Sequence, residues 1–86
     1  MNKRYYEQAK INVIDRFLYE IWDLPLDQDV LKNLLLEEVF SEYENLGGSE
    51  SWWDQNYESL ILENLNYLAK KLYEARLMFC FEGGTP

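Results

Sequence analysis

Two short breaks divide the helical pattern of this chain into three segments. Apolar residues recur every three or four positions from Tyr6 to Phe79, which is the spacing that aligns side chains along one face of an α-helix. Pro25 disfavours helical geometry in the residue before it, and Gly47 with Gly48 favours a helix end. We therefore predict helices over residues 4–23, 28–46 and 52–79, followed by a frayed tail over 82–86.

Residues suited to cap helices follow both breaks. Asp27 precedes the second predicted helix, and its carboxylate can accept hydrogen bonds from the free amides of the first turn. Ser51 and Asp54 have the three-residue spacing of a reciprocal cap, which predicts that the third helix begins near Trp52.

The third predicted helix is longer than the other two. At about 1.5 Å per residue it would extend roughly 40 Å, against about 30 Å for each of the others. We therefore expect it to overhang the bundle, to bend or to break. Asn56, Asn64 and Asn66 mark where a kink costs least, and residues 78–81 are candidates to fold back as an extended end.

Short connections make consecutive helices antiparallel neighbours. The predicted fold is all-α, a small antiparallel three-helix bundle, with a fourth helix if the last one breaks near Asn64 to Asn66. The chain has 86 residues, 48% of them hydrophobic, which is enough for one domain with its own core. Because no linker or repeat divides the sequence, we predict a single helical domain over residues 1–86.

Charge is distributed unevenly along the chain, whose formal net charge is −8. Residues 17–69 contain twelve carboxylates and one cation, Lys32, whereas lysine and arginine are in surplus at both ends. This acidic segment repels the phosphates of DNA and RNA, and it lacks the cations with which helices bind anionic membranes. No apolar run approaches the length of a membrane span, and no secretion signal is visible. We expect a cytoplasmic protein that binds neither nucleic acid nor membrane directly.

The residue types used in most catalytic sites are scarce. The chain has no histidine, which is the side chain most used for proton transfer near neutral pH and the commonest zinc ligand, and it has one cysteine. Neither a phosphate-binding glycine loop nor a calcium-binding loop is present. We therefore expect a protein that is not an enzyme, with no catalytic residues, no cofactor and no metal site.

A run of carboxylates continues from the second predicted helix into the third. Four glutamates occupy the C-terminal half of the second helix, where the helix dipole favours cations, and Glu38 with Glu42 forms a like-charge pair. These placements lower the stability of the helix itself, which suggests that the glutamates serve another purpose. We interpret them as a surface that binds a basic protein. Trp52 and Trp53 are about 100° apart on a helix, so one should enter the core while the other faces partly outward, beside the acids. The candidate partner-binding residues are Glu37, Glu38, Glu42, Glu44, Glu50, Trp52, Asp54 and Glu58.

Two classes of function fit these features, beside the simpler interpretation that the carboxylates only keep the protein soluble. The leading hypothesis is an acidic helical binding protein that imitates phosphates and so inhibits or neutralises a nuclease or nucleic-acid-binding protein. Immunity proteins of nuclease toxins and phage-type nuclease inhibitors belong to this functional class. The alternative is a helical assembly subunit or chaperone that forms a homodimer or holds a partner helix through apolar surface.

Overall fold

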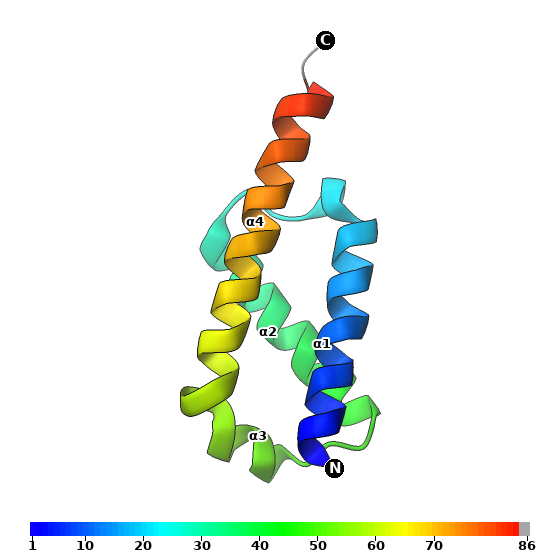
Figure 1. Ribbon diagram of the computed structural model, residues 1–86, viewed down its shortest axis with the longest axis vertical. Helices are drawn as coiled ribbons and strands as arrows, with labels where there is room; N and C mark the ends of the chain where they lie inside the picture. Colours follow the sequence, from blue (N-terminus) through cyan, green and yellow to red (C-terminus); the bar gives the residue numbers. More distant parts are fainter. Residues whose placement is uncertain (85–86) are drawn as a thin grey trace.

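The chain folds into the predicted all-α bundle. The computed structural model describes the backbone of residues 1–84 and the side chains of residues 1–78. All its regular elements in that range are helical (Figure 1). In chain order they are α1 (Asn2–Tyr19), the 3₁₀ turn η1 (Ile21–Asp23), α2 (Gln28–Asn45), α3 (Glu50–Asn56), the π-helical turn η2 (Tyr57–Ile61) and α4 (Leu62–Gly84).

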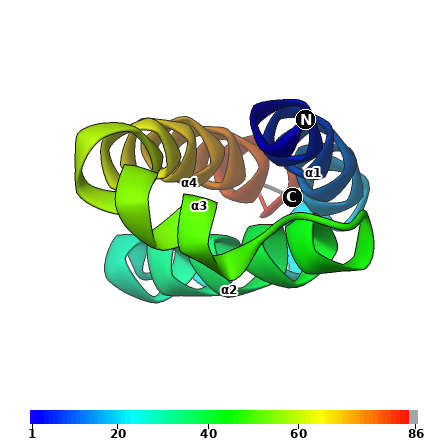
Figure 2. The same ribbon diagram turned by 90° about the horizontal axis from the view of Figure 1, so that it is seen from below.

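The three long helices run up, down and up, in two layers. Helices α1 and α4 lie in one layer and α2 lies in the other, where it packs against both (Figure 2). Helix α3 lies at the end of the bundle where the chain begins (Figure 1). The buried core lies between the layers and takes residues from every helix. Consequently α2 presents one outer face away from both of its neighbours.

The first helix ends four residues earlier than predicted. Helix α1 stops at Tyr19, and the chain turns more tightly through η1 before Pro25. Ile21 and Leu24 are both buried there. Leu24 has the extended backbone expected of a residue before proline.

The predicted cap of the second helix is confirmed, whereas that of the third helix is wrong. The Asp27 carboxylate accepts hydrogen bonds from the backbone amides of Asp29 and Val30, at 2.9 and 3.1 Å. Helix α3 begins at Glu50 and is capped by Ser49, whose Oγ accepts from the backbone amide of Trp52 at 3.1 Å. Ser51 lies inside that helix and does not cap it.

Contacts with neighbouring elements explain why Ser49 is the cap. Its backbone amide donates to the Asn2 side chain at 3.1 Å, and its carbonyl accepts from the Tyr43 hydroxyl at 2.7 Å. The preceding turn is equally constrained, because Gly47 has a positive φ of 105° and a Cβ at Gly48 would overlap the buried ring of Tyr43. The turn between α2 and α3 is therefore held by contacts with α1 and α2.

The long third helix is interrupted at Asn56, one of the three predicted kink positions, and not at the predicted break near Asn64 to Asn66. The π-helical turn η2 separates α3 from α4, and Asn56 precedes it with a distorted backbone. The Asn56 side chain donates to the backbone carbonyl of Trp52 at 2.8 Å. A π-helical turn is wider than an α-helical one and reorients α3, so that Trp53 and Ile61 are both buried. Asn64 and Asn66 lie within regular α4.

Helix α4 overhangs the rest of the bundle, as its predicted length required. It remains helical to Gly84, so residues 78–81 do not fold back as an extended end, and residues 82–84 of the predicted tail are helical. Residues 85–86 lie outside the described part. In Figure 1 the last turns of α4 extend past η1 and the start of α2.

Candidate functional site

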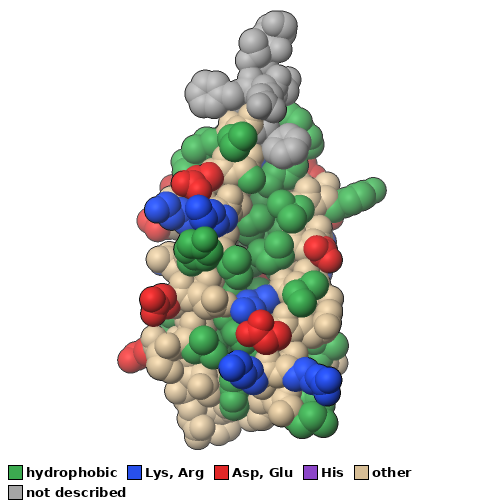
Figure 3. Space-filling view, viewed as in Figure 1, with side chains coloured by type: hydrophobic (Ala, Val, Ile, Leu, Met, Phe, Trp, Pro, Cys, Tyr) green, Lys and Arg blue, Asp and Glu red, His purple; other side chains and the backbone are tan. Residues whose placement is uncertain are grey.

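The layers of the bundle differ in charge. Helix α2 contains five carboxylates and one lysine, a net charge of −4, and α3 with η2 adds three carboxylates and no cation. Helix α1 contains four cations and two carboxylates, a net charge of +2, while α4 has three of each and is neutral. The face formed by α1 and α4 accordingly mixes both signs with apolar side chains (Figure 3). The excess negative charge belongs to α2, to α3 with η2, and to the connection between α1 and α2, which adds Glu20, Asp23 and Asp27.

Two of the predicted partner-binding glutamates lie on the outer face of α2. Glu37 and Glu44 are exposed, and neither takes part in an ion pair within the described part of the chain. They are seven residues apart, which is almost two full helical turns and roughly 10 Å along the axis. The two carboxylates therefore point in nearly the same direction.

Two other predicted residues on the same helix turn toward α1 instead. An Arg16 guanidinium nitrogen lies 2.6 Å from a Glu38 carboxylate oxygen, and the Asn12 side-chain amide donates to Glu42 at 2.8 Å. These contacts offset the repulsion between Glu38 and Glu42, which lie four residues apart on α2, because each carboxylate has a partner on α1. Glu38 and Glu42 thus contribute to the packing of α1 on α2.

The remaining predicted carboxylates lie on α3 and η2. Glu50, Asp54 and Glu58 are all exposed and have no ion-pair partner among the residues the structure describes. Glu50 occupies the first turn of α3, where the dipole stabilises a negative charge. We call the set of five exposed carboxylates the acidic surface: Glu37, Glu44, Glu50, Asp54 and Glu58.

The two adjacent tryptophans behave as their separation on a helix predicted. Trp53 is buried, and its ring centroid lies 4.9 Å from that of Phe40 and 5.4 Å from that of Tyr43. Trp52 is half-buried, with its ring 5.8 Å from both Tyr6 and Tyr43. Glu50 and Asp54 lie two residues before and two residues after Trp52 in the sequence. These five aromatic residues join α1, α2 and α3 in one cluster.

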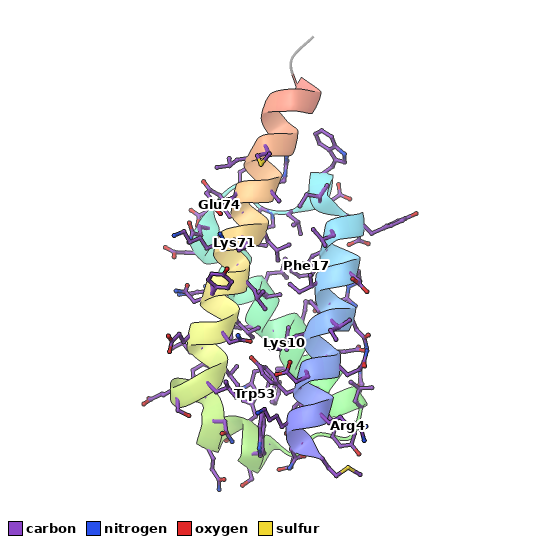
Figure 4. All side chains as sticks on the ribbon, in the orientation of Figure 1. Arg4, Lys10, Phe17, Trp53, Lys71 and Glu74 are labelled. Carbon is purple, nitrogen blue, oxygen red and sulfur yellow. The ribbon has the colours of Figure 1, made fainter. Side chains whose placement is uncertain are left out.

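A polar contact between α1 and α4, which the sequence did not reveal, lies beside this cluster. Asn64 of α4 accepts hydrogen bonds from the Tyr6 hydroxyl at 2.9 Å and from the Lys10 ammonium group at 2.7 Å. Lys10 also lies 3.2 Å from Glu7 and 4.7 Å from the centre of the Tyr6 ring, and its side chain is only 14% exposed. Figure 4 shows Lys10 on α1 on the side that faces α4. The contact satisfies polar groups where the two helices approach.

Two shallow grooves flank this polar contact. One has a volume of about 300 Å³ and is lined by residues of η2 and α4, including Glu63, Asn64 and Tyr67. The other, about 280 Å³, lies between α1 and α4 and is lined by Lys10, Ile14 and Leu68 among others. Both are at the lower size limit of small-molecule sites.

Within the range that the structure describes, no three potential ligands among Asp, Glu, Cys and His are grouped to hold a metal ion. Each helix in that range is too short or too polar to cross a membrane.

Comparisons of the chain with protein-family models, with curated proteins and with solved structures find no match. The placement of the side chains is therefore the basis on which function is inferred.

Proposed function

We propose that the protein is a non-enzymatic binding protein that docks the acidic surface onto a basic protein and neutralises it. The observation that carries this proposal is the exposure of five carboxylates, from Glu37 to Glu58, with no ion-pair partner in the described part of the chain. Surfaces of one sign speed the encounter with an oppositely charged partner and fix its orientation.

The elements that hold these carboxylates favour such a role. Asp27 caps α2, Ser49 caps α3, and buried Trp53 anchors α3 against the other helices. Carboxylates on capped, packed helices keep their spacing, so a partner does not have to order the backbone that presents them. Because the relative positions of the carboxylates are fixed, the acidic surface can bind in a groove of the partner that normally binds the phosphates of a nucleic acid. A nuclease or a nucleic-acid-binding protein in the cytoplasm is the class of partner we propose.

The structure narrows the set of residues to be tested. Changing Glu38 or Glu42 would disturb contacts with Arg16 and Asn12, so a loss of binding could arise from altered packing of α1. The acidic surface avoids this problem, because its members make no such contacts. The test variant neutralises the whole surface with near-isosteric amides: Glu37→Gln, Glu44→Gln, Glu50→Gln, Asp54→Asn and Glu58→Gln.

A matched control variant removes the same number of charges from other exposed positions. Its substitutions are Asp15→Asn, Glu20→Gln, Asp23→Asn, Asp29→Asn and Glu74→Gln, all at exposed residues. Both variants shift the net charge by +5, from −8 to −3. Any difference between them therefore reports the place of the charges and not their number.

The experiment measures inhibition of purified basic nucleases, with a fluorogenic DNA or RNA substrate, by the wild-type protein and both variants. We expect the wild type and the control variant to inhibit the same enzyme, and the acidic-surface variant to be at least about a hundredfold weaker, since rim charges contribute mainly through the encounter rate. Equal inhibition by both variants would contradict the proposal, as would inhibition by none of the three across the panel.

A further inference from the structure

Exposed apolar side chains gather at the end of the molecule opposite to α3. The described residues include nine exposed large hydrophobic side chains, and six of them belong to the end of α1, η1, the connection from η1 to α2, the start of α2 and the overhanging part of α4. Tyr19 is the most exposed at 91%, and Met78 is 60% exposed. We call these six residues the apolar end: Leu18, Tyr19, Trp22, Leu26, Val30 and Met78.

Helix α4 leaves the bundle at this end. The Arg76 side chain donates to the backbone carbonyl of Leu24 at 3.2 Å and lies over the Trp22 ring at 5.9 Å, which places this turn of α4 against η1 and the corner that follows it. Beyond Arg76 the helix continues to Gly84, and its sequence from Leu77 to Phe81 is entirely apolar. An apolar sequence at the end of a helix that leaves its own bundle favours contact with another protein chain.

The charges around the apolar end are complementary to one another. The corner between α1 and α2 contains four exposed carboxylates and no cation from residue 20 to residue 29: Glu20, Asp23, Asp27 and Asp29. The adjoining turns of α4 contain three cations and one carboxylate: Lys70, Lys71, Arg76 and Glu74. In a two-fold dimer the same patch meets itself, so its charges can pair across the interface only if the patch contains both signs. This patch has an anionic side and a cationic side.

We propose that the apolar end is the interface of a two-fold homodimer. The overhanging turns of α4 from one copy would lie against the corner of the other copy, with Lys70 and Lys71 next to the partner's carboxylates. Aromatic side chains bury about 150–250 Å² each, so Tyr19 and Trp22 together would contribute roughly 300 Å² toward the roughly 800 Å² that each partner buries in a standard interface. Such a dimer leaves both acidic surfaces free, and it does not depend on the function proposed for them. Because Glu20, Asp23 and Asp29 lie at its edge, the inhibition assays compare the variants at protein concentrations where the wild type is a single chain.

Two double variants test this interface. Tyr19→Glu with Met78→Glu places charges in the apolar end, whereas Ile11→Glu with Tyr67→Glu introduces the same charges at exposed positions of α1 and α4 outside it. All four positions are more than half exposed, so both variants should retain the helical fold. Far-UV circular dichroism checks that they do.

Sedimentation equilibrium over a range of protein and salt concentrations measures the molecular mass of each protein in solution, and from it the strength of self-association. We expect the wild type and the Ile11/Tyr67 variant to approach twice the chain mass of 10.4 kDa, and the Tyr19/Met78 variant to associate at least tenfold more weakly. Raising the salt concentration should leave the wild-type dimer intact, because its core is apolar. A wild type that remains a single chain at every concentration would overturn the proposal, since another molecule would then have to cover the apolar end. Equal weakening of both variants would overturn it as well.

Discussion

Replacing Trp53 with alanine is expected to lower the free energy of unfolding by about 3–5 kcal/mol, the usual cost of truncating a buried aromatic residue. A domain of 86 residues has a free energy of unfolding of about 4–13 kcal/mol, so this single change removes a large part of the total. The reason is its position: the Trp53 ring contacts Tyr6 of α1 and both Phe40 and Tyr43 of α2, and no other side chain of α3 is fully buried.

Urea denaturation followed by far-UV circular dichroism measures this effect at one fixed protein concentration, since dimerisation would otherwise shift the midpoint. The control is Tyr67→Ala, which removes an exposed aromatic ring from α4 and should cost about 1 kcal/mol or less. If the Trp53→Ala protein were within 1 kcal/mol of the wild type, the aromatic cluster would not be what holds α3 in place.

The second large effect is a loss of stability at alkaline pH. Burial raises the pKa of Tyr6 and of Tyr43 above the ordinary value near 10, and the nearby Glu7 carboxylate adds to the rise at Tyr6. In the unfolded chain both hydroxyls ionise near pH 10. The fold therefore keeps its full stability below pH 10 and loses it as the pH rises from there toward the folded-state pKa values. For Tyr6, whose pKa is raised most, the loss approaches about 1.4 kcal/mol per pH unit, and Tyr43 adds to it in the same direction.

Urea denaturation at pH 8, 10 and 11 tests this dependence. Tyr6→Phe gives up the hydrogen bond to Asn64, so it should be less stable than the wild type at pH 8 by about 1 kcal/mol, yet it should lose less stability between pH 10 and 11. Tyr43→Phe should reduce the alkaline loss in the same way. Tyr67→Phe, at an exposed position, serves as the control and should keep the wild-type slope. A slope that neither buried substitution changes would show that other groups cause the alkaline loss.

The helices that the sequence predicted correctly are bounded by residues whose effect is local. Pro25 and the Gly47–Gly48 pair act on their own backbone, and Asp27 caps its own helix whatever the rest of the chain does. Whether Ser49 or Ser51 caps α3 is not decided locally, because Ser49 is held by hydrogen bonds with Asn2 of α1 and Tyr43 of α2. Helix length alone required an overhang or a break, and Asn56 was one of three predicted kink positions. The sequence did not distinguish Asn56 from Asn64 and Asn66, which lie within regular α4.

The same distinction applies to the candidate site. The spacing of the tryptophans correctly predicted that one would be buried and one half-buried, since adjacent helical residues are about 100° apart. Glu37 and Glu38 are separated by the same angle, which already implies that they face different directions. The sequence could not tell which of them would meet α1, because that depends on the side of α2 on which α1 packs. The contact of Lys10 with Asn64 joins residues 54 positions apart and left no local signal.

The most direct test of the role proposed for the acidic surface is the association rate constant with a nuclease that the protein inhibits, measured by stopped-flow fluorescence at increasing salt. Between about 0.05 and 0.3 M NaCl we expect the wild-type rate constant to fall at least tenfold, because salt screens long-range attraction. The matched control with Asp15, Glu20, Asp23, Asp29 and Glu74 neutralised should retain most of that dependence. The variant with Glu37, Glu44, Glu50, Asp54 and Glu58 neutralised should be slow and nearly independent of salt. A wild-type rate constant that does not change with salt, or two variants that respond alike, would contradict an encounter directed by these five carboxylates.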